Sequence, residues 1–394
     1  MHSYPLYYEQ PYQKNHTATI VDIIDGNLIL DSTICYPEGG GQSGDIGTIS
    51  GVQLLNTTKD DDHTIHHHVK QQVFHIGQQV HIELDWQHRY HFMQMHTAQH
   101  VASGLLFTRF GIQTVSVHQG ERILTIETDA ASVEQEICFE LEDLVNAVVR
   151  GNHTVHYEVH TQSSAQSLGL RRSIKVEGDG VRLVVVDDVD TVACGGLHVA
   201  NTTEIELFHY SGQEKIRGHI RLIFTVGAIA RQEIRKAQDA VTELGMLFSA
   251  PLDDLVEVAK ASLAQAAQTK SELRRAQEAI ASLHLSSLVA HASLVGSVPV
   301  VYWNVAEHVD LKDVAQALVE HEDLLLFAAK MVEGRLLWLV GVQGKASTLF
   351  SFNASKSTLL AAIEGKGGGK APLFQGSAQA DSTVFFSTCK DLMQ

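Results

Sequence analysis

Cysteine is scarce in this sequence: the 394 residues include four, at Cys35, Cys138, Cys194 and Cys389. They are not clustered, which excludes the disulfide framework that holds many small secreted domains together. We therefore expect reduced thiols and a cytoplasmic location. Because the residue is rare here, a cysteine that falls inside a motif is informative.

Long hydrophobic runs are also lacking. No apolar stretch approaches the roughly 20 residues that a membrane helix needs, and residues 1–10 have neither the basic nor the apolar region of a signal peptide. We expect no membrane partner. The composition, 44% hydrophobic and 19% charged, is that of a globular protein, and the chain is long enough for two or three domains with separate cores.

Positive charge is in deficit. The sequence has 29 basic and 46 acidic side chains, which gives a formal net charge of −17. This balance argues against broad, non-specific nucleic-acid binding, because phosphate binding requires positive potential. A local basic patch on an acidic protein would still bind nucleic acid.

Hydrophobic periodicity divides the chain into four segments and predicts an α+β fold. Residues 1–88 read as strands, and residues 89–227 alternate strands and helices after an opening helix. Residues 228–292 have almost no glycine and repeat apolar residues at three- and four-residue spacing. This spacing predicts a helical hairpin or a dimerising coiled coil, with a plain helical spacer as the alternative. Residues 293–394 return to strands and helices.

Two short motifs combine histidine with the scarce cysteine. His96 and His100 lie four apart on a helix predicted over residues 85–110, so they project from one helix face one turn apart. Cys194 and His198 are also four apart, in a glycine-rich turn. Three imidazoles and one thiolate would complete a tetrahedral zinc site. In a chain with 23 histidines the helical pair alone is weak evidence, and the cysteine strengthens it.

Two glycine-rich stretches could approach a ligand closely. Five glycines within residues 35–47 permit positive φ and close backbone approach, although an elaborate turn between strands would have the same composition. Residues 365–370 combine four glycines with Lys366 and Lys370, so that open N–H groups and positive charge could hold phosphate. The spacing is not that of a P-loop, and by itself the stretch is more typical of a flexible turn.

Taken in order, these stretches resemble a known family. Residues 36–45 resemble the pocket loop of the alanyl-tRNA synthetase editing domain, and residues 96–100 and 194–199 resemble its two zinc motifs. Residues 365–376 are similar to the glycine-rich end of the DHHA1 domain that closes the synthetase. The resemblance covers essentially the whole chain but leaves no room for an aminoacylation domain, because the glycine loop begins at about residue 37. The chain therefore resembles a free-standing alanyl-tRNA editing protein of the long AlaX type.

The resemblance implies an architecture for each segment. Residues 1–88 would form a small β-barrel-like subdomain with the pocket loop, and residues 89–227 an α/β-sandwich editing core that binds zinc. Residues 228–292 would form the helical hairpin or coiled coil, and residues 293–394 a DHHA1-like α/β domain. A homodimer through either of the last two segments is a further expectation.

The resemblance also implies a reaction: hydrolysis of a wrongly attached amino acid, chiefly serine, from tRNA(Ala), rather than amino-acid activation. A synthetase pocket cannot strongly exclude a slightly different small side chain, since one small group is worth only ~1–3 kcal/mol. A second site that hydrogen-bonds the serine hydroxyl would spare alanyl-tRNA. The preference for serine or glycine, and a catalytic or structural role for zinc, stay open. The competing hypothesis is a non-catalytic, zinc-containing tRNA-binding module.

Individual residues receive roles by the same resemblance. One zinc ion would be bound by His96, His100, Cys194 and His198. Gly40 and Gly41 would line the pocket, and Gln42 would contact the serine hydroxyl or the attacking water. Glu38 would be the general base, with an ordinary surface-loop carboxylate as the alternative. Arg221 would bind the substrate at a tRNA phosphate, with a surface role at a strand end as an equal alternative. Lys345, Lys366 and Lys370 would contact the tRNA. Leu197 departs from the family pattern, which has threonine there.

Overall fold

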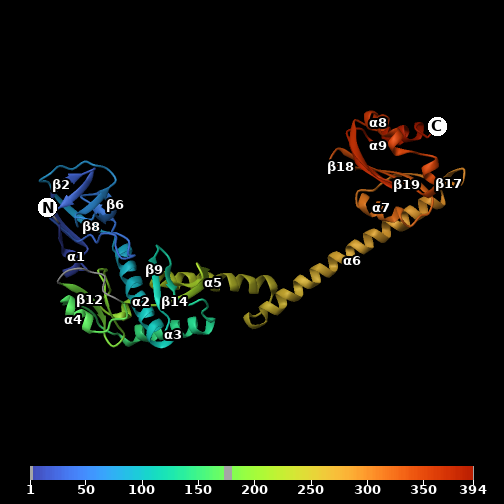
Figure 1. Ribbon diagram of the computed structural model, residues 1–394. Coiled ribbons are helices and arrows are strands. Elements are labelled where there is room, and N and C mark those ends of the chain that lie inside the picture. Colours follow the sequence, from blue (N-terminus) through green and yellow to red (C-terminus); the bar gives the residue numbers. More distant parts are fainter. Residues whose placement is uncertain (1–2, 173–179, 394) are drawn as a thin grey trace. The chain divides into compact units, whose positions relative to one another are not determined.

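The computed structural model describes residues 3–172 and 180–393 and confirms a mixed α+β fold (Figure 1). The chain separates into two compact units, Met1–Glu243 and Leu244–Gln394. Among the described residues, no helix combines the length and the apolar character required to span a bilayer.

The N-terminal segment is a closed six-stranded barrel, as expected. Its hairpin turn places Asp25 at φ 50° and Gly26 at φ 82°, the paired positive values that suit a tight turn between twisted strands. Apolar side chains such as Ile20, Leu28 and Ile82 fill the interior. The strands, in barrel order, are β2 (Asn15–Ile24), β3 (Asn27–Leu30), β7 (Ile65–Val69), β6 (Val52–Lys59), β5 (Gly47–Ile49) and β8 (Gln79–Leu84). Before and beside it lie β1 (Tyr4–Pro5), α1 (Leu6–Glu9) and β4 (Ser32–Thr33).

A long buried helix, α2 (Trp86–Phe110), follows the barrel and confirms the helix expected over residues 85–110. Asp85 caps its N-terminus by accepting from the His88 amide, and Gly111 ends it at φ 68°. Its middle turns are buried against α3 and a four-stranded antiparallel sheet. These neighbours are α3 (Gln135–Gly151), β14 (Phe208–Ile216), β15 (His219–Val226), β10 (Leu124–Thr128) and β9 (Thr114–Gln119).

A second antiparallel sheet follows in the chain, and its last strand contacts α2. It contains β11 (Val155–His160), β12 (Val181–Val186) and β13 (Asp190–Ala193), and β13 delivers the backbone directly to Cys194. Two short helical elements belong to the same region, α4 (Gln162–Ser167) and η1 (Thr202–Ile205).

The helical character expected for residues 228–292 is confirmed. The segment contains α5 (Gly227–Phe248), η2 (Leu252–Asp254) and α6 (Leu255–Ala290). Several large apolar side chains of α6 are exposed, among them Leu263 and Leu283. Pairing of this segment with itself or with a second copy stays a prediction.

The C-terminal unit is built on a six-stranded sheet with helices on both faces. Alternate residues of β18 enter two separate cores, Leu325 and Phe327 on one face and Leu324 and Leu326 on the other. In sheet order the strands are β16 (Ser293–Val295), β17 (Val298–Asn304), β18 (Leu324–Val332), β19 (Arg335–Gln343), β21 (Leu373–Ala378) and β20 (Gly365–Lys370). The helical elements are α7 (Leu311–Leu318), η3 (Gly344–Thr348), α8 (Phe352–Ala362) and α9 (Ser382–Asp391).

The glycine–lysine stretch at residues 365–370 is a strand, which corrects the expectation of a flexible turn. It is β20, which pairs along its whole length with β21 at the edge of the sheet. A Cβ at Gly367 or Gly376 would clash with the indole ring of buried Trp338. The glycines therefore make room for Trp338, a distant residue whose position local composition does not indicate.

Candidate metal centre

Four side chains from α2 and from the turn after β13 meet at one point. The ligand atoms of His96, His100, Cys194 and His198 all lie within 4.8 Å of one another. The Cys194 Sγ atom is 3.4 Å from His96 Nε2 and 3.6 Å from His198 Nε2. Tetrahedral coordination with usual Zn–S and Zn–N bonds separates sulfur from nitrogen by about 3.6 Å. The structure thus brings together the two halves of the predicted motif.

Hydrogen bonds orient two of the imidazoles toward the sulfur. The Nδ1–H group of His96 donates to Gln42 Oε1 over 3.0 Å, and that of His198 donates to Thr97 Oγ1 over 3.2 Å. In both rings this leaves the Nε2 lone pair facing Cys194. Such a partner on the far nitrogen is the usual arrangement for a metal-binding histidine.

Burial keeps these imidazoles neutral. It lowers the pKa of His96 to about 3 and the pKa values of His100 and His198 well below the ordinary value, with smaller contributions from neighbouring positive charge. Burial also raises the pKa of the Cys194 thiol. Nδ1 of His100 is buried and has no hydrogen-bond partner. Neutral imidazoles and a thiol that ionises on binding are a donor set that fits zinc.

Gln42 connects the glycine-rich loop to both halves of the cluster. Its side chain is 1% exposed, and Oε1 accepts from His96 Nδ1 and, over 3.0 Å, from the Leu197 amide. Gly196 lies against the same histidine, where a Cβ would clash with the His96 ring. Gln42 is therefore in contact with a metal-binding candidate, and its amide oxygen is already engaged.

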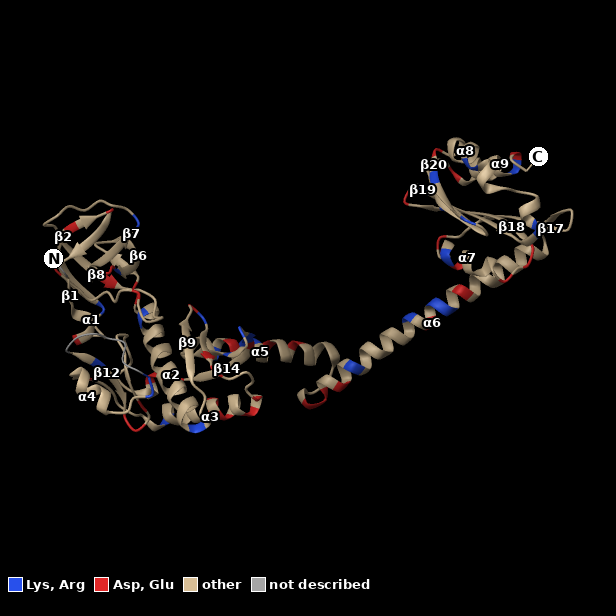
Figure 2. Ribbon diagram, viewed as in Figure 1, with Lys and Arg blue, Asp and Glu red and all other residues tan. Residues whose placement is uncertain are grey.

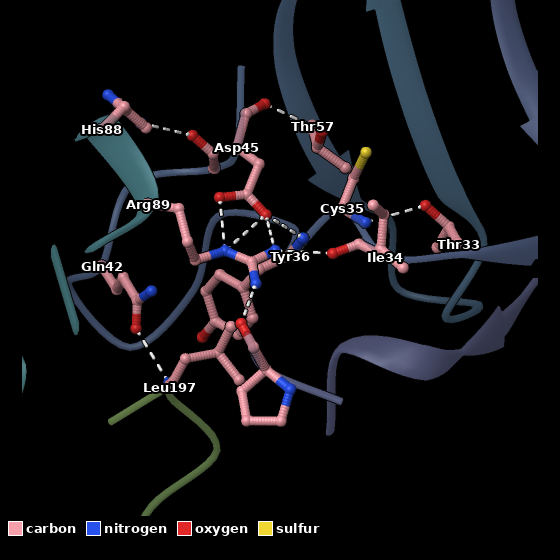
Figure 3. A network of polar contacts seen from close by, with 12 residues as sticks. Thr33, Ile34, Cys35, Tyr36, Gln42, Asp45, Thr57, His88, Arg89 and Leu197 are labelled. Atoms are coloured by element: carbon pink, nitrogen blue, oxygen red, sulfur yellow. Dashed lines mark hydrogen bonds and ion pairs between the residues drawn. The ribbon is translucent and has the colours of Figure 1, made fainter. Parts of the chain in front are cut away.

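A buried ion pair holds the loop against α2 (Figure 3). Arg89, two turns before His96, donates through Nε to Asp45 Oδ1 over 2.8 Å and pairs with Asp45 again through Nη2. It also donates to the carbonyls of Pro11 and Ile34. Asp45 accepts in addition from the Tyr36 amide at the other end of the loop. These contacts fix both ends of the loop relative to the helix that carries His96 and His100.

Arg182 holds the turn that carries the cysteine. Its Nη1 donates to the carbonyls of Cys194 over 2.7 Å and of Gly196 over 3.0 Å. The guanidinium lies 3.8 Å from the ring centre of Tyr157 and 4.8 Å from that of Tyr8, within the range of cation–π attraction. The turn is therefore anchored by charge from β12.

The cluster lines a cavity of about 350 Å³. His96, His100 and Cys194 form part of its wall. Glu38 and Lys59 line it with opposite charges, and Gly40 lines it with its backbone. Arg171 and Arg172 also line it, and Arg171 is fixed by two hydrogen bonds to Asp190. Candidate metal ligands, residues of the glycine-rich loop and three basic side chains therefore line the same cavity, although the chain as a whole is acidic.

Other predicted residues lie at different places. Arg221, on β15, pairs with Glu214 at 2.9 Å and Glu127 at 3.8 Å and is absent from the lining of this cavity. Gly41 and Gln42 line a neighbouring cavity. In the C-terminal unit Lys345 pairs with Asp323 at 3.1 Å. Lys366 and Lys370 belong to β20 and are exposed. Figure 2 marks basic residues on this strand in blue.

Several residues of the site carry no motif that would have identified them. Arg89, Asp45, Arg182 and Lys59 are ordinary charged residues in sequence. One signal was available for Arg89, because an arginine within the apolar stretch of a helix requires a buried partner. No comparable signal identifies the partner, which lies 44 positions earlier.

Comparison with known proteins finds two family matches, one in the barrel segment and one around the cysteine-bearing turn. Residues 7–88 match the family of class II (A) tRNA synthetases, and residues 181–223 match the second additional domain of threonyl and alanyl tRNA synthetases. The first match covers all six strands of the barrel, and the second contains Cys194 and His198.

Full-length relatives match over much of the chain. The alanine–tRNA ligase of Sulfurisphaera tokodaii is 33% identical over 62% of this chain and 28% of the ligase, and that of Pyrobaculum aerophilum is 29% identical over 98% and 44%. The chain thus spans less than half the length of these ligases. The alanyl-tRNA editing protein Aarsd1 of Mus musculus is 26% identical over 91% of this chain and 86% of that protein.

Among solved structures, the C-Ala domain of Aquifex aeolicus alanyl-tRNA synthetase matches 26% of this chain and 93% of its own, at 21% identity. Its TM-score of 0.22 is too low to establish a common fold. The sequence matches, in contrast, agree with one another and with the expected resemblance: the chain is a homologue of the alanyl-tRNA synthetases and of the alanyl-tRNA editing protein.

Proposed function

We propose that this protein is an aminoacyl-tRNA deacylase that hydrolyses mischarged tRNA(Ala), with Ser-tRNA(Ala) as its main substrate, at a zinc-containing site. One observation carries the proposal: the ligand atoms of three histidines and one cysteine lie within 4.8 Å of one another, and three of these residues, His96, His100 and Cys194, line a cavity that the glycine-rich loop also lines. The relationship to an alanyl-tRNA editing protein supports the same substrate.

His96, His100, Cys194 and His198 would hold the zinc ion. When bound, zinc would either polarise the ester and activate water or, if all four side chains coordinate it, organise the pocket. Gln42 keeps the His96 ring and the Leu197 backbone in place. Glu38 would be the general base, since it is the one carboxylate among the described residues that line the cavity. Its role would be to accept a proton from the attacking water.

The cavity suits a small amino acid joined to a larger carrier. Its volume of about 350 Å³ is at the lower end of the range for ligand sites. Serine and glycine are the alternatives for the preferred amino acid, and a hydroxyl contact would favour serine over alanine. Leu197 is fully buried, so its side chain contributes packing at a position where the family has threonine.

The test compares hydrolysis of Ser-, Gly- and Ala-tRNA(Ala) by the wild type and by Cys194→Ala. We expect the wild type to contain one zinc ion per chain and to deacylate Ser-tRNA(Ala) fastest. Cys194→Ala should lose zinc and at least tenfold in rate while remaining folded, because one ligand is gone. Cys138→Ala removes a buried thiol outside the cluster and should retain both metal and activity.

Two results would contradict the proposal. Wild-type rates equal to spontaneous ester hydrolysis, together with tRNA binding, would establish the competing zinc-containing binding module. Alanine-dependent exchange of pyrophosphate into ATP would establish amino-acid activation, the activity of the ligases that the chain matches in part.

A further inference from the structure

A second cavity of about 510 Å³ borders the same glycine turn. It shares Glu38, Gly39, Gly40 and Lys59 with the cavity beside the metal cluster. The shared glycines leave the border open: Gly40 has φ 61°, and a Cβ there would meet no atom within 4 Å. The two cavities are therefore neighbours that share four lining residues, and no side chain of Gly39 or Gly40 stands between them.

Gln119 lines this second cavity and has an unused amide. The residue ends β9 and is 4% exposed, yet both Oε1 and Nε2 are buried without a hydrogen-bond partner. Within residues 3–172 and 180–393 it is the one amide side chain with both atoms buried and unpaired. A buried amide without partners costs free energy, so a ligand that pairs with both atoms would be bound selectively.

The chemistry of the amide and of the substrate identifies that ligand. A glutamine amide can accept from the 6-amino group of adenine and donate to an adjacent ring nitrogen, forming a bidentate pair. The amino acid of an aminoacyl-tRNA is esterified to its 3′-terminal adenosine, so an adenine base lies one ribose away from the ester. Lys59 lines both cavities and forms no ion pair within the described parts of the chain. Its positive charge would suit the phosphate that precedes this adenosine.

We propose that the second cavity is the subsite for the 3′-terminal adenine of the tRNA, read by the Gln119 amide. The assignment rests on the proposed function, because the first cavity then holds the aminoacyl group. Gln119 is a substrate-binding residue in this arrangement and takes no part in bond breaking.

Binding of short probes tests the subsite without hydrolysis. The probes are the trinucleotide CCA and the same trinucleotide ending in purine riboside, which lacks the 6-amino group, titrated into the full-length protein. The wild type should bind CCA about tenfold more tightly, because the purine analogue loses the hydrogen bond from the 6-amino group and leaves Gln119 Oε1 without a partner. Gln119→Met keeps the length of the side chain and removes the amide. It should bind both probes equally weakly.

A stability measurement separates this role from a structural one. Because the amide has no partner in the free protein, Gln119→Met should have a Tm no lower than the wild type. Gln113→Met, an exposed position directly before β9, should retain the wild-type preference for CCA. A Gln119→Met variant that unfolds at lower temperature and binds CCA like the wild type would overturn the proposal.

The remaining outcomes distinguish this proposal from the function on which it rests. Equal wild-type affinity for the two trinucleotides overturns the subsite even if Ser-tRNA(Ala) is hydrolysed. Selective CCA binding without hydrolysis supports the subsite while the deacylase fails. Adenosine 5′-monophosphate is the third probe: affinity equal to that for CCA would assign the cavity to a free nucleotide and overturn the assignment to tRNA.

Discussion

His67 is a histidine that the barrel buries completely and uses as a neutral hydrogen-bonding group. Its Nδ1–H donates to the Leu28 carbonyl over 3.0 Å, and its Nε2 accepts from Thr33 Oγ1 over 2.8 Å. Burial, with smaller contributions from the charges of His66 and His68 and against the opposing effect of the Leu28 hydrogen bond, lowers its pKa to about 4. The unfolded chain has the ordinary histidine pKa of about 6.5. Between these values only the unfolded state binds the proton, so stability falls as the pH falls from about 6.5 toward 4.

We predict that this residue alone costs the folded state about 2 kcal/mol at pH 5 relative to pH 7.5. Urea unfolding gives the free energy of unfolding of the wild type and of His67→Asn at both pH values. The wild type should lose about 2 kcal/mol more than the variant between pH 7.5 and pH 5. His63→Asn is the matched control, since His63 is exposed and has φ 63°, a conformation that asparagine tolerates. Equal pH dependence in wild type and His67→Asn would refute the prediction.

At the scale of elements, the Arg89–Asp45 pair joins the glycine-rich loop to α2. Arg89→Met leaves the Asp45 carboxylate buried without its counter-charge, which should reduce the free energy of unfolding by about 3–5 kcal/mol. Because the same loop carries Gln42, zinc affinity measured by competition with a chelator should also fall. The double variant Arg89→Met/Asp45→Asn should recover part of the stability. A double variant as unstable as the sum of both single variants would contradict this coupling.

The edge strand β20 provides a second test at this scale, with the control on the same strand. A Cβ at Gly367 would clash with Trp338 and the Gln375 carbonyl, whereas one at Gly368 would meet only the flexible Lys356 Nζ at 3.3 Å. Gly367→Ala should therefore destabilise the C-terminal unit by about 1–3 kcal/mol. Gly368→Ala should be neutral or slightly stabilising. Urea unfolding of both variants checks the prediction, and equal effects would show that the Trp338 ring moves aside freely.

The elements that sequence predicts best are those with local signals. Asp85 and Gly111 bound α2 with recognisable capping residues, and the near absence of glycine marks α5 and α6. The prediction of a flexible turn at β20 is wrong, because its glycine Gly367 makes room for the ring of Trp338, about 30 positions earlier in sequence.

The same distinction holds for the site. The four cluster residues were predictable from two local motifs, and the structure brings them together. The hydrogen bond between the Leu197 amide and Gln42 joins two loops that are 155 positions apart in sequence. The amide of Gln119 is unpaired because no polar group of the described residues is placed to hydrogen-bond with it. Neither property has a local pattern. Arg221 was expected at the substrate, but strand pairing places it between Glu127 and Glu214, which sequence alone does not indicate.

For the molecule as a whole, tRNA binding has to overcome a net charge of −17. Exposed cations without acidic neighbours are therefore the groups to test. Lys366 and Lys370 are exposed on β20, and neither forms an ion pair within the parts of the chain that the structure describes. Lys345 is paired with Asp323, so its contribution to binding should be smaller.

We predict that Lys366→Gln/Lys370→Gln weakens binding of uncharged tRNA(Ala) and flattens its salt dependence. If each lysine neutralises one phosphate, the slope of log affinity against log salt concentration should fall by roughly 1.4–1.8. Fluorescence anisotropy between 50 and 200 mM salt measures the slope. Lys236→Gln/Lys260→Gln removes the same charge from lysines that pair with Glu233 and Glu257 and should leave the slope nearly unchanged. Equal slopes for the β20 variant and the wild type would remove this strand from the tRNA interface, and the basic residues beside the first cavity would then have to supply the binding charge.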